Sequence, residues 1–139
     1  MPDAVISDAG ERRLLARLIA GWVVVYRLYT NNYTPTTGDT GGEYTQPTWP
    51  GYLPITAANW QPPLTDASGG AYTSADLCIF IRGAGPPSGS SAYGYYTTDA
   101  SGGYLWGQRD DAAPYPITAE GGTYVVFPAF RGFNCPPTG

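Results

Sequence analysis

With 139 residues, of which 42% are hydrophobic, the chain is long enough for one compact domain with its own core. Only 13% of its residues are charged, about half the usual share for a globular domain, and the seven basic residues are all arginine. The net charge of -4 argues against nucleic-acid binding, which needs a basic surface that releases counterions, and against binding to an anionic membrane.

Turn-forming residues are abundant, with 19 glycines and 14 prolines. Disorder is nevertheless not expected, because disordered chains are poor in aromatic residues and this chain has 12 tyrosines and 4 tryptophans. The composition indicates a loop-rich, mainly β protein, and we expect a single domain over residues 1–139.

The sequence SDAGERRLLARLIA predicts one helix, over about residues 8–20. Asp8 is placed to cap its N-terminus, with Glu11 three positions later, the spacing of a capping box. Gly21 supplies a stop signal. The helix carries an apolar stripe made of Leu14, Leu15, Leu18 and Ile19.

The rest of the chain reads as short strands rich in β-branched and aromatic residues. Single extended segments are expected at 22–29, 51–57, 59–64, 71–83 and 123–133, and a hairpin at 92–109. The hairpin turns at residues 99–103, where glycines can adopt positive φ. Together with the helix, these strands predict an antiparallel β-sandwich or open barrel with long loops rich in Gly, Pro and Thr.

One long stretch, NNYTPTTGDTGGEYTQPTWPGY at residues 31–52, has neither a helical nor a sustained strand pattern. A structureless segment of this length in a compact domain is usually functional or wrongly assigned. It carries four aromatic residues that a linker would not need: Tyr33, Tyr44, Trp49 and Tyr52. We therefore expect an extended, arm-like loop at about residues 30–50, anchored by these rings either on its own domain or on a neighbouring subunit. The tail at 134–139 is expected to be loose or held by a neighbour.

No catalytic residue is predicted. Without histidine, a Ser–His–Asp or Cys–His arrangement is excluded. Asp39, Asp66 and Asp99 all sit beside turn-forming residues, so each is expected to bond nearby backbone in an Asx-type turn rather than to act as an acid or base.

No metal or cofactor is expected either. The sequence Asp-Ala-Ser-Gly-Gly lacks the further acidic ligands of a calcium loop, and GAGPPSG at 83–89 lacks the lysine and helix of a phosphate-binding loop. Cys78 and Cys135 cannot close a zinc site without histidine. Because no segment resembles a signal peptide, we expect folding in a cytoplasm, which favours two free thiols over a disulfide between Cys78 and Cys135.

The aromatic residues are the remaining clue to function. Three roles are open to them: packing in the core, contact with another protein, or a platform for a carbohydrate. Arg109, which precedes two aspartates, could form a local ion pair or a contact between subunits. Tyr and Trp are enriched where proteins meet. The candidate interface residues are Tyr33, Tyr44, Trp49, Tyr52, Trp60, Trp106 and Arg109.

Three pieces of the chain, in order, are SDAGERRLLARLIAG, NNYTPTTG before PGY, and YGYYTTDASGGYLWGQR. In these pieces the chain resembles small structural proteins of tailed bacteriophages, over about residues 7–127. The resemblance implies a virion protein made in the host cytoplasm, with capsid or tail proteins and copies of itself as partners, either as a homo-oligomer or bound to a lattice. It carries over no catalytic residues.

Three functions follow as expectations. The first is a non-enzymatic capsid decoration or cement protein that binds capsid subunits and sister copies through aromatic loops. The second is a tail or fibre component of the virion. The third is a carbohydrate-binding domain that uses Trp49, Trp60 or Trp106 as a platform.

Overall fold

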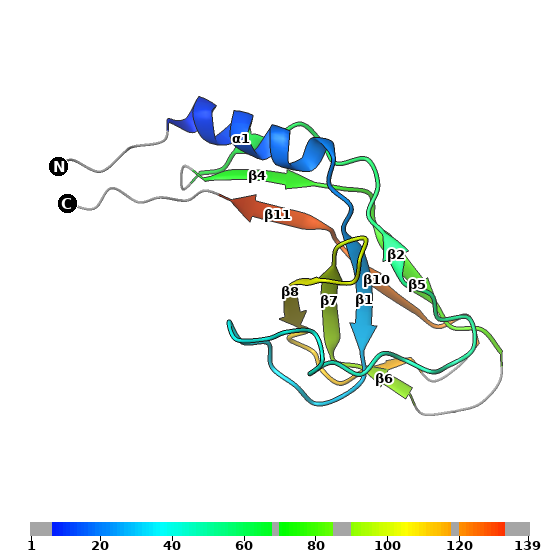
Figure 1. Ribbon diagram of the computed structural model, residues 1–139. Helices are drawn as coiled ribbons and strands as arrows, with labels where there is room; N and C mark the ends of the chain where they lie inside the picture. Colours follow the sequence, from blue (N-terminus) through cyan, green and yellow to red (C-terminus); the bar gives the residue numbers. More distant parts are fainter. Residues whose placement is uncertain (1–6, 68–69, 85–89, 118–119, 133–139) are drawn as a thin grey trace. The chain divides into compact units, whose positions relative to one another are not determined.

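The computed structural model describes residues 7–67, 70–84, 90–117 and 120–132 (Figure 1). The chain is mainly β, with one helix among the described residues and with antiparallel strand pairs. The predicted fold class is therefore confirmed. The predicted tail at 134–139 and Cys135 lie outside the described residues.

Contacts within the chain divide it into two compact units. The first consists of Met1–Trp22, Ala58–Asp76 and Phe127–Gly139. The second consists of Val23–Ala57 and Leu77–Val126. Both are built from segments that are discontinuous in sequence. The single domain expected over 1–139 stays a prediction.

The first unit consists of one helix and a three-stranded antiparallel sheet in the order β11-β4-β3. Its elements are α1 (Asp8–Ala20), β3 (Leu64–Thr65), β4 (Ala71–Ser74) and β11 (Ala129–Gly132). The helix lies along β4 (Figure 1). Trp22, which follows the helix, packs against Trp60 and Phe130, with ring centroids 5.5 Å and 5.0 Å apart.

The predicted helix bounds are confirmed, but two of its details are wrong. Ser7 rather than Asp8 is the N-cap, because the Ser7 Oγ accepts a hydrogen bond from the Gly10 N–H at 3.0 Å. The small sheet covers only part of the predicted apolar stripe, so Leu15 is fully buried whereas Leu14 and Leu18 are exposed.

The second unit is built around a four-stranded antiparallel sheet in the order β2-β1-β7-β8, with two two-stranded sheets, β10-β5 and β6-β9. Its elements are β1 (Val25–Tyr29), β2 (Ile55–Thr56), β5 (Cys78–Ile81), β6 (Ser90–Ala92), β7 (Gly94–Thr98), β8 (Tyr104–Arg109), β9 (Tyr115–Ile117) and β10 (Thr123–Val126). The predicted hairpin is β7–β8, with a bulge next to Thr97 and Thr98.

The β5–β10 ribbon packs one face against the four-stranded sheet, which gives the second unit a sandwich-like core. Cys78 and Phe80 on β5, and Tyr124 and Val126 on β10, are buried on that face. Burial raises the pKa of Tyr26 on β1, and nearby Tyr95 and Cys78 raise the pKa further.

Two predicted strands, 71–83 and 123–133, are each divided into two. The first forms β4 and β5, and the second forms β10 and β11. The paired ladder is interrupted at Phe127 and Pro128, because proline has no N–H to donate; the Pro128 carbonyl still accepts from the Ala75 N–H at 3.0 Å. The proline is a sequence signal of this break, although the residues around it are apolar.

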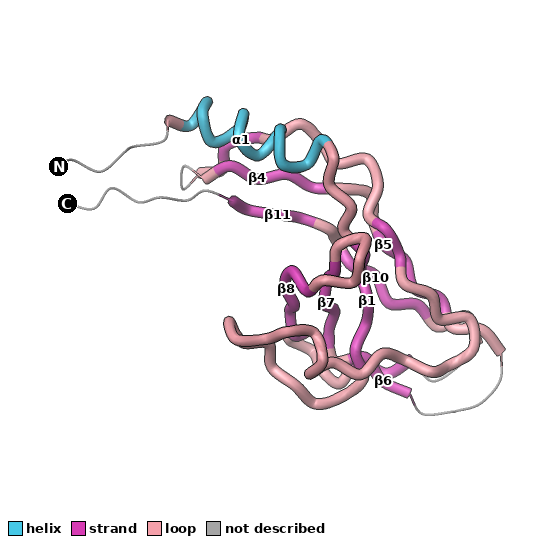
Figure 2. The backbone as a smooth tube through the Cα atoms, viewed as in Figure 1, coloured by secondary structure: helices cyan, strands magenta, loops and turns pink. Residues whose placement is uncertain are grey.

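The predicted strands at 22–29, 51–57 and 59–64 are shorter than expected, and regular pairing is confined to β1, β2 and the start of β3. Figure 2 shows the long irregular connection that follows β1. Among the described residues, no helix has the length and hydrophobicity needed to span a membrane.

Candidate functional site

The irregular segment after β1, residues 30–52, is folded against its own unit; we call it the aromatic segment. Hydrogen bonds close its first part into a loop. The Thr30 N–H donates to the Thr45 carbonyl at 2.8 Å, and the Asn31 side chain donates to the Glu43 carbonyl at 2.8 Å. The Thr45 N–H donates back to Asn31 Oδ1 at 2.9 Å. Such closed, self-packed loops are compact rather than arm-like.

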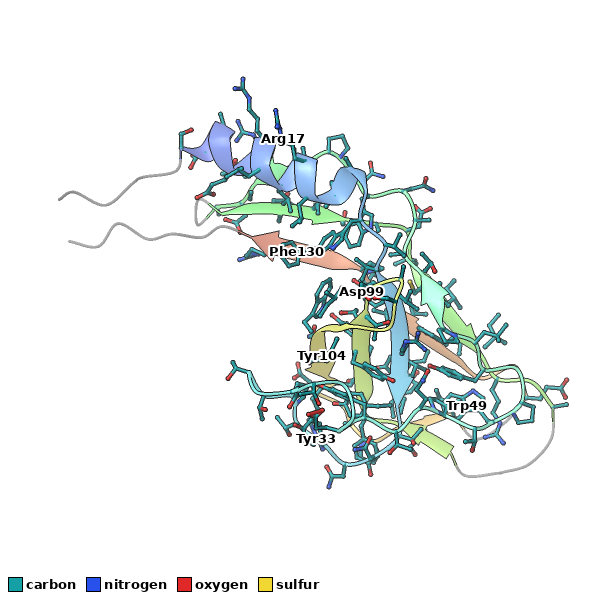
Figure 3. The ribbon with its side chains drawn as sticks, in the orientation of Figure 1. Arg17, Tyr33, Trp49, Asp99, Tyr104 and Phe130 are labelled. Carbon is teal, nitrogen blue, oxygen red and sulfur yellow. The ribbon has the colours of Figure 1, made fainter. Side chains whose placement is uncertain are left out.

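Tyr44 is the centre of a tyrosine cluster and is only 7% exposed. Its ring stacks on Tyr96 of β7 at 4.5 Å and on Tyr104 of β8 at 5.5 Å. Tyr29 and Tyr33 contact it edge-on, at 5.0 Å and 5.3 Å. Tyr44 therefore joins the aromatic segment to one face of the four-stranded sheet, and Figure 3 shows Tyr33 and Tyr104 on this part of the unit.

A single carboxylate organises the hydroxyl groups of this cluster. Asp39 accepts hydrogen bonds from the hydroxyls of Tyr33 and Tyr44, the latter at 2.6 Å, and from the Thr36 N–H and hydroxyl at 3.0 Å and 2.8 Å. Burial alone would raise the pKa of Asp39, but the hydrogen bonds from Tyr33, Tyr44 and Thr36 outweigh it and hold the pKa well below its usual range. Asp39 is thus an ionised structural anchor.

This network predicts a specific loss of stability in acid. Because the pKa of Asp39 is lowered by folding, its contribution is complete above the unfolded value of about 3.9 and is lost as pH falls below it. In Asp39→Asn we expect a shallower fall of the free energy of unfolding below about pH 4 than in the wild type. Urea unfolding at a series of pH values measures the free energy of unfolding of both proteins. Asp111→Asn, a substitution at an exposed aspartate, is the control. If the free energy of unfolding of Asp39→Asn fell with pH as steeply as that of the wild type, Asp39 would not be the ionised anchor of the cluster.

The second part of the aromatic segment covers the edge of β1 beyond its short pairing with β2. Trp49 is only 4% exposed and meets Tyr52 edge-on at 6.1 Å. Tyr52 stacks on Phe80 at 6.1 Å, and its hydroxyl accepts from the Leu28 N–H at 3.2 Å and donates to Gln46 at 2.7 Å. An open strand edge is a liability that covering segments remove, so these rings have a structural role.

Three predicted interface residues lie outside the aromatic segment. Trp60 packs on Trp22 in the first unit, and Trp106 packs edge-on against Tyr26 at 6.2 Å in the second. The Arg109 guanidinium lies 5.4 Å from the centre of the Tyr93 ring and donates to Asn32 Oδ1 at 2.8 Å.

Two of the seven predicted interface residues are enclosed within the second unit. Tyr44 and Trp49 are buried, and Tyr33, Tyr52, Trp60, Trp106 and Arg109 are half-buried with partners in their own units. Of the two anchoring alternatives, the structure has the aromatic segment held on its own domain. A role for the five half-buried residues in contact with another protein stays a prediction.

The outer face of the β5–β10 ribbon is a surface that sequence reasoning missed. Ile79 and Ile81 on β5 are 47% and 56% exposed, and Val125 on β10 is 39% exposed. Val125 is the register partner of Ile79, so these side chains are contiguous. The sequence CIFI is apolar at successive positions, and such a run does not reveal which of its side chains face outward. We call Ile79, Ile81 and Val125 the ribbon face.

No protein-family model, curated protein or solved structure matches this chain.

The acidic residues in turns have the structural roles expected of them. Asp99 accepts from the backbone N–H groups of Ser101 and Gly103 at 3.0 Å and 2.8 Å. Asp66 accepts from the Gly70 N–H at 3.0 Å and pairs with Arg131 at 3.0 Å. Within the described residues, no group of three or more Cys, Asp or Glu side chains is placed to hold a metal ion.

Cys78, the cysteine within the described residues, is in its unreactive form near neutral pH. Cys78 is buried, and burial raises the pKa of its thiol to about 11. The thiol therefore stays protonated near neutral pH, and the thiolate is the reactive form.

Proposed function

We propose that this chain is a non-enzymatic structural protein of a tailed-bacteriophage virion, and that it binds the capsid as a decoration or cement protein. The resemblance of its three sequence pieces to phage structural proteins supports the virion assignment. The exposed ribbon face is the observation that carries the adhesive role. The hydrogen-bonded carboxylates of Asp39, Asp66 and Asp99 support a structural rather than a catalytic use of acidic residues.

The ribbon face has the chemistry of a contact surface. Neither β5 nor β10 contains a charged residue, and a contiguous exposed apolar surface marks an interaction site. A flat β face with β-branched side chains packs well against another apolar surface. Its partner would be a capsid subunit. Covering Ile79, Ile81 and Val125 would remove their apolar surface from water and so stabilise the complex.

Many weak contacts suffice for such a protein. Each copy needs only modest affinity, because neighbouring sites in a capsid lattice hold many copies at a high effective concentration. The small number of charged residues limits repulsion between neighbouring copies. A tail or fibre position is the alternative that uses the same chemistry with fewer copies.

Substitutions on the ribbon face test this proposal. The double variant Ile79→Thr, Ile81→Thr keeps β-branched side chains but removes about 2 kcal/mol of apolar burial in the contact, or about 30-fold in affinity per copy. We expect a large drop in incorporation into particles, measured by quantitative mass spectrometry, with unchanged thermal stability.

The matched control is Leu53→Thr, since Leu53 is 72% exposed but lies outside the ribbon. It should incorporate like the wild type. Wild-type incorporation of the double variant would show that the ribbon face is not the adhesive surface.

A further inference from the structure

A groove runs along β8, the edge strand of the four-stranded sheet. Residues 104–107 of β8 form one side and residues 35–37 of the aromatic segment form the other. Its volume is about 410 Å³, within the range of about 300–1,000 Å³ for small-molecule sites. The groove lies on the second unit alone, away from the residues of the ribbon face.

The residues lining the groove are suited to a neutral, amphipathic ligand. None of the seven is charged. Tyr104 offers an aromatic ring, and Thr36 and Thr37 offer hydroxyl groups on the opposite wall. A sugar ring has an apolar C–H face that packs on an aromatic ring and hydroxyl groups at its edge that pair with polar side chains.

Tyr104, rather than Trp106, is the ring available for stacking. Trp106 pairs in register with Thr97, whereas Tyr104 pairs with Thr98, so their side chains lie on opposite faces of the sheet. The Trp106 ring packs on Tyr26. Tyr44 stacks on the half-buried Tyr104 ring, and Tyr104 also lines the groove.

The two walls are held in place by the same network. Thr36 is bonded to Asp39 through its N–H and its hydroxyl, and Asp39 accepts from the Tyr44 hydroxyl. The Tyr44 and Tyr104 hydroxyls are 2.8 Å apart and hydrogen-bonded. A groove fixed in advance binds with less loss of conformational entropy on association.

We propose that the groove between β8 and residues 35–37 binds a short neutral saccharide, stacked on Tyr104 and hydrogen-bonded by Thr36 and Thr37. This site is independent of the proposed capsid contact. An extended peptide is the competing occupant, because an edge strand can pair with another chain. The hydroxyl-bearing wall at Thr36 and Thr37 favours the saccharide.

The test uses the full chain and a panel of neutral hexoses, N-acetylhexosamines and their disaccharides, followed by NMR titration. We expect at least one of them to bind, with shifts of the backbone signals of residues 35–37 and 104–107. Thr37→Val should weaken that sugar about five- to tenfold through the loss of one hydrogen bond, and Tyr104→Leu should weaken it at least tenfold by removing the ring.

The control is Thr48→Val, an exposed threonine outside the groove, which should bind like the wild type. Thermal melting of each variant separates lost binding from lost folding. Three results would overturn the proposal: no binding by any sugar in the panel, binding that survives both groove substitutions, or preferential binding at β8 of a synthetic Thr–Val hexapeptide.

Discussion

Replacement of Trp49 by alanine is expected to lower the free energy of unfolding by about 3–5 kcal/mol, the cost of truncating a buried aromatic side chain to alanine. Trp49 is 4% exposed, so its removal leaves a cavity that the packed neighbours cannot fill. It also removes the edge contact that supports Tyr52, whose hydroxyl caps the edge of β1. Urea denaturation of the isolated protein measures the loss.

The control is Leu53→Ala, which truncates an exposed apolar side chain four residues later. It should change stability by less than about 0.5 kcal/mol. If Trp49 were instead an arm residue that anchors on another subunit, Trp49→Ala would be as stable as the wild type and only its incorporation into particles would fall.

Replacement of Tyr44 by alanine is expected to cost a similar or larger amount, about 3–5 kcal/mol for the ring and about 1–3 kcal/mol for the hydrogen-bonding groups left without a partner. Tyr44 is stacked between Tyr96 and Tyr104 and bonds Asp39. The variant Tyr44→Phe separates these contributions, because it keeps the ring and loses only the hydroxyl. We expect Tyr44→Phe to show only the smaller hydrogen-bond cost.

Tyr115→Phe serves as the control for the hydroxyl, since Tyr115 is exposed; it should match the wild type. Chemical denaturation, with tyrosine circular dichroism in the near ultraviolet, reports both the stability and the packing of the cluster. A Tyr44→Ala protein with wild-type stability would mean that the aromatic segment does not belong to the core.

The parts of the fold that the sequence predicted well are those fixed by local chemistry. The helix at Asp8–Ala20 is marked by its cap region and by Gly21, and the β7–β8 hairpin by the Asp99 turn. The break within 123–133 is marked in the sequence by Pro128, whereas the break within 71–83 was not predictable, because it depends on where the strand changes partner. Ala75 and Pro128 are hydrogen-bonded although they are distant in sequence.

The role of the aromatic segment was only partly accessible from sequence. The density of tyrosine and tryptophan in residues 31–52 showed that the segment must be anchored. It could not show on what, since Tyr44 meets Tyr96 and Tyr104 only through the fold. The ribbon face was missed for the same reason. Ile79 and Phe80 are both apolar, and only the sheet pairing determines which one faces outward.

The measurement that tests the proposed function most directly is the copy number of this protein in purified phage particles, determined by quantitative mass spectrometry. We expect the protein in every particle, in numbers that scale with the capsid lattice. A handful of copies per particle would move it to the tail. Its absence from purified particles would contradict the virion assignment altogether.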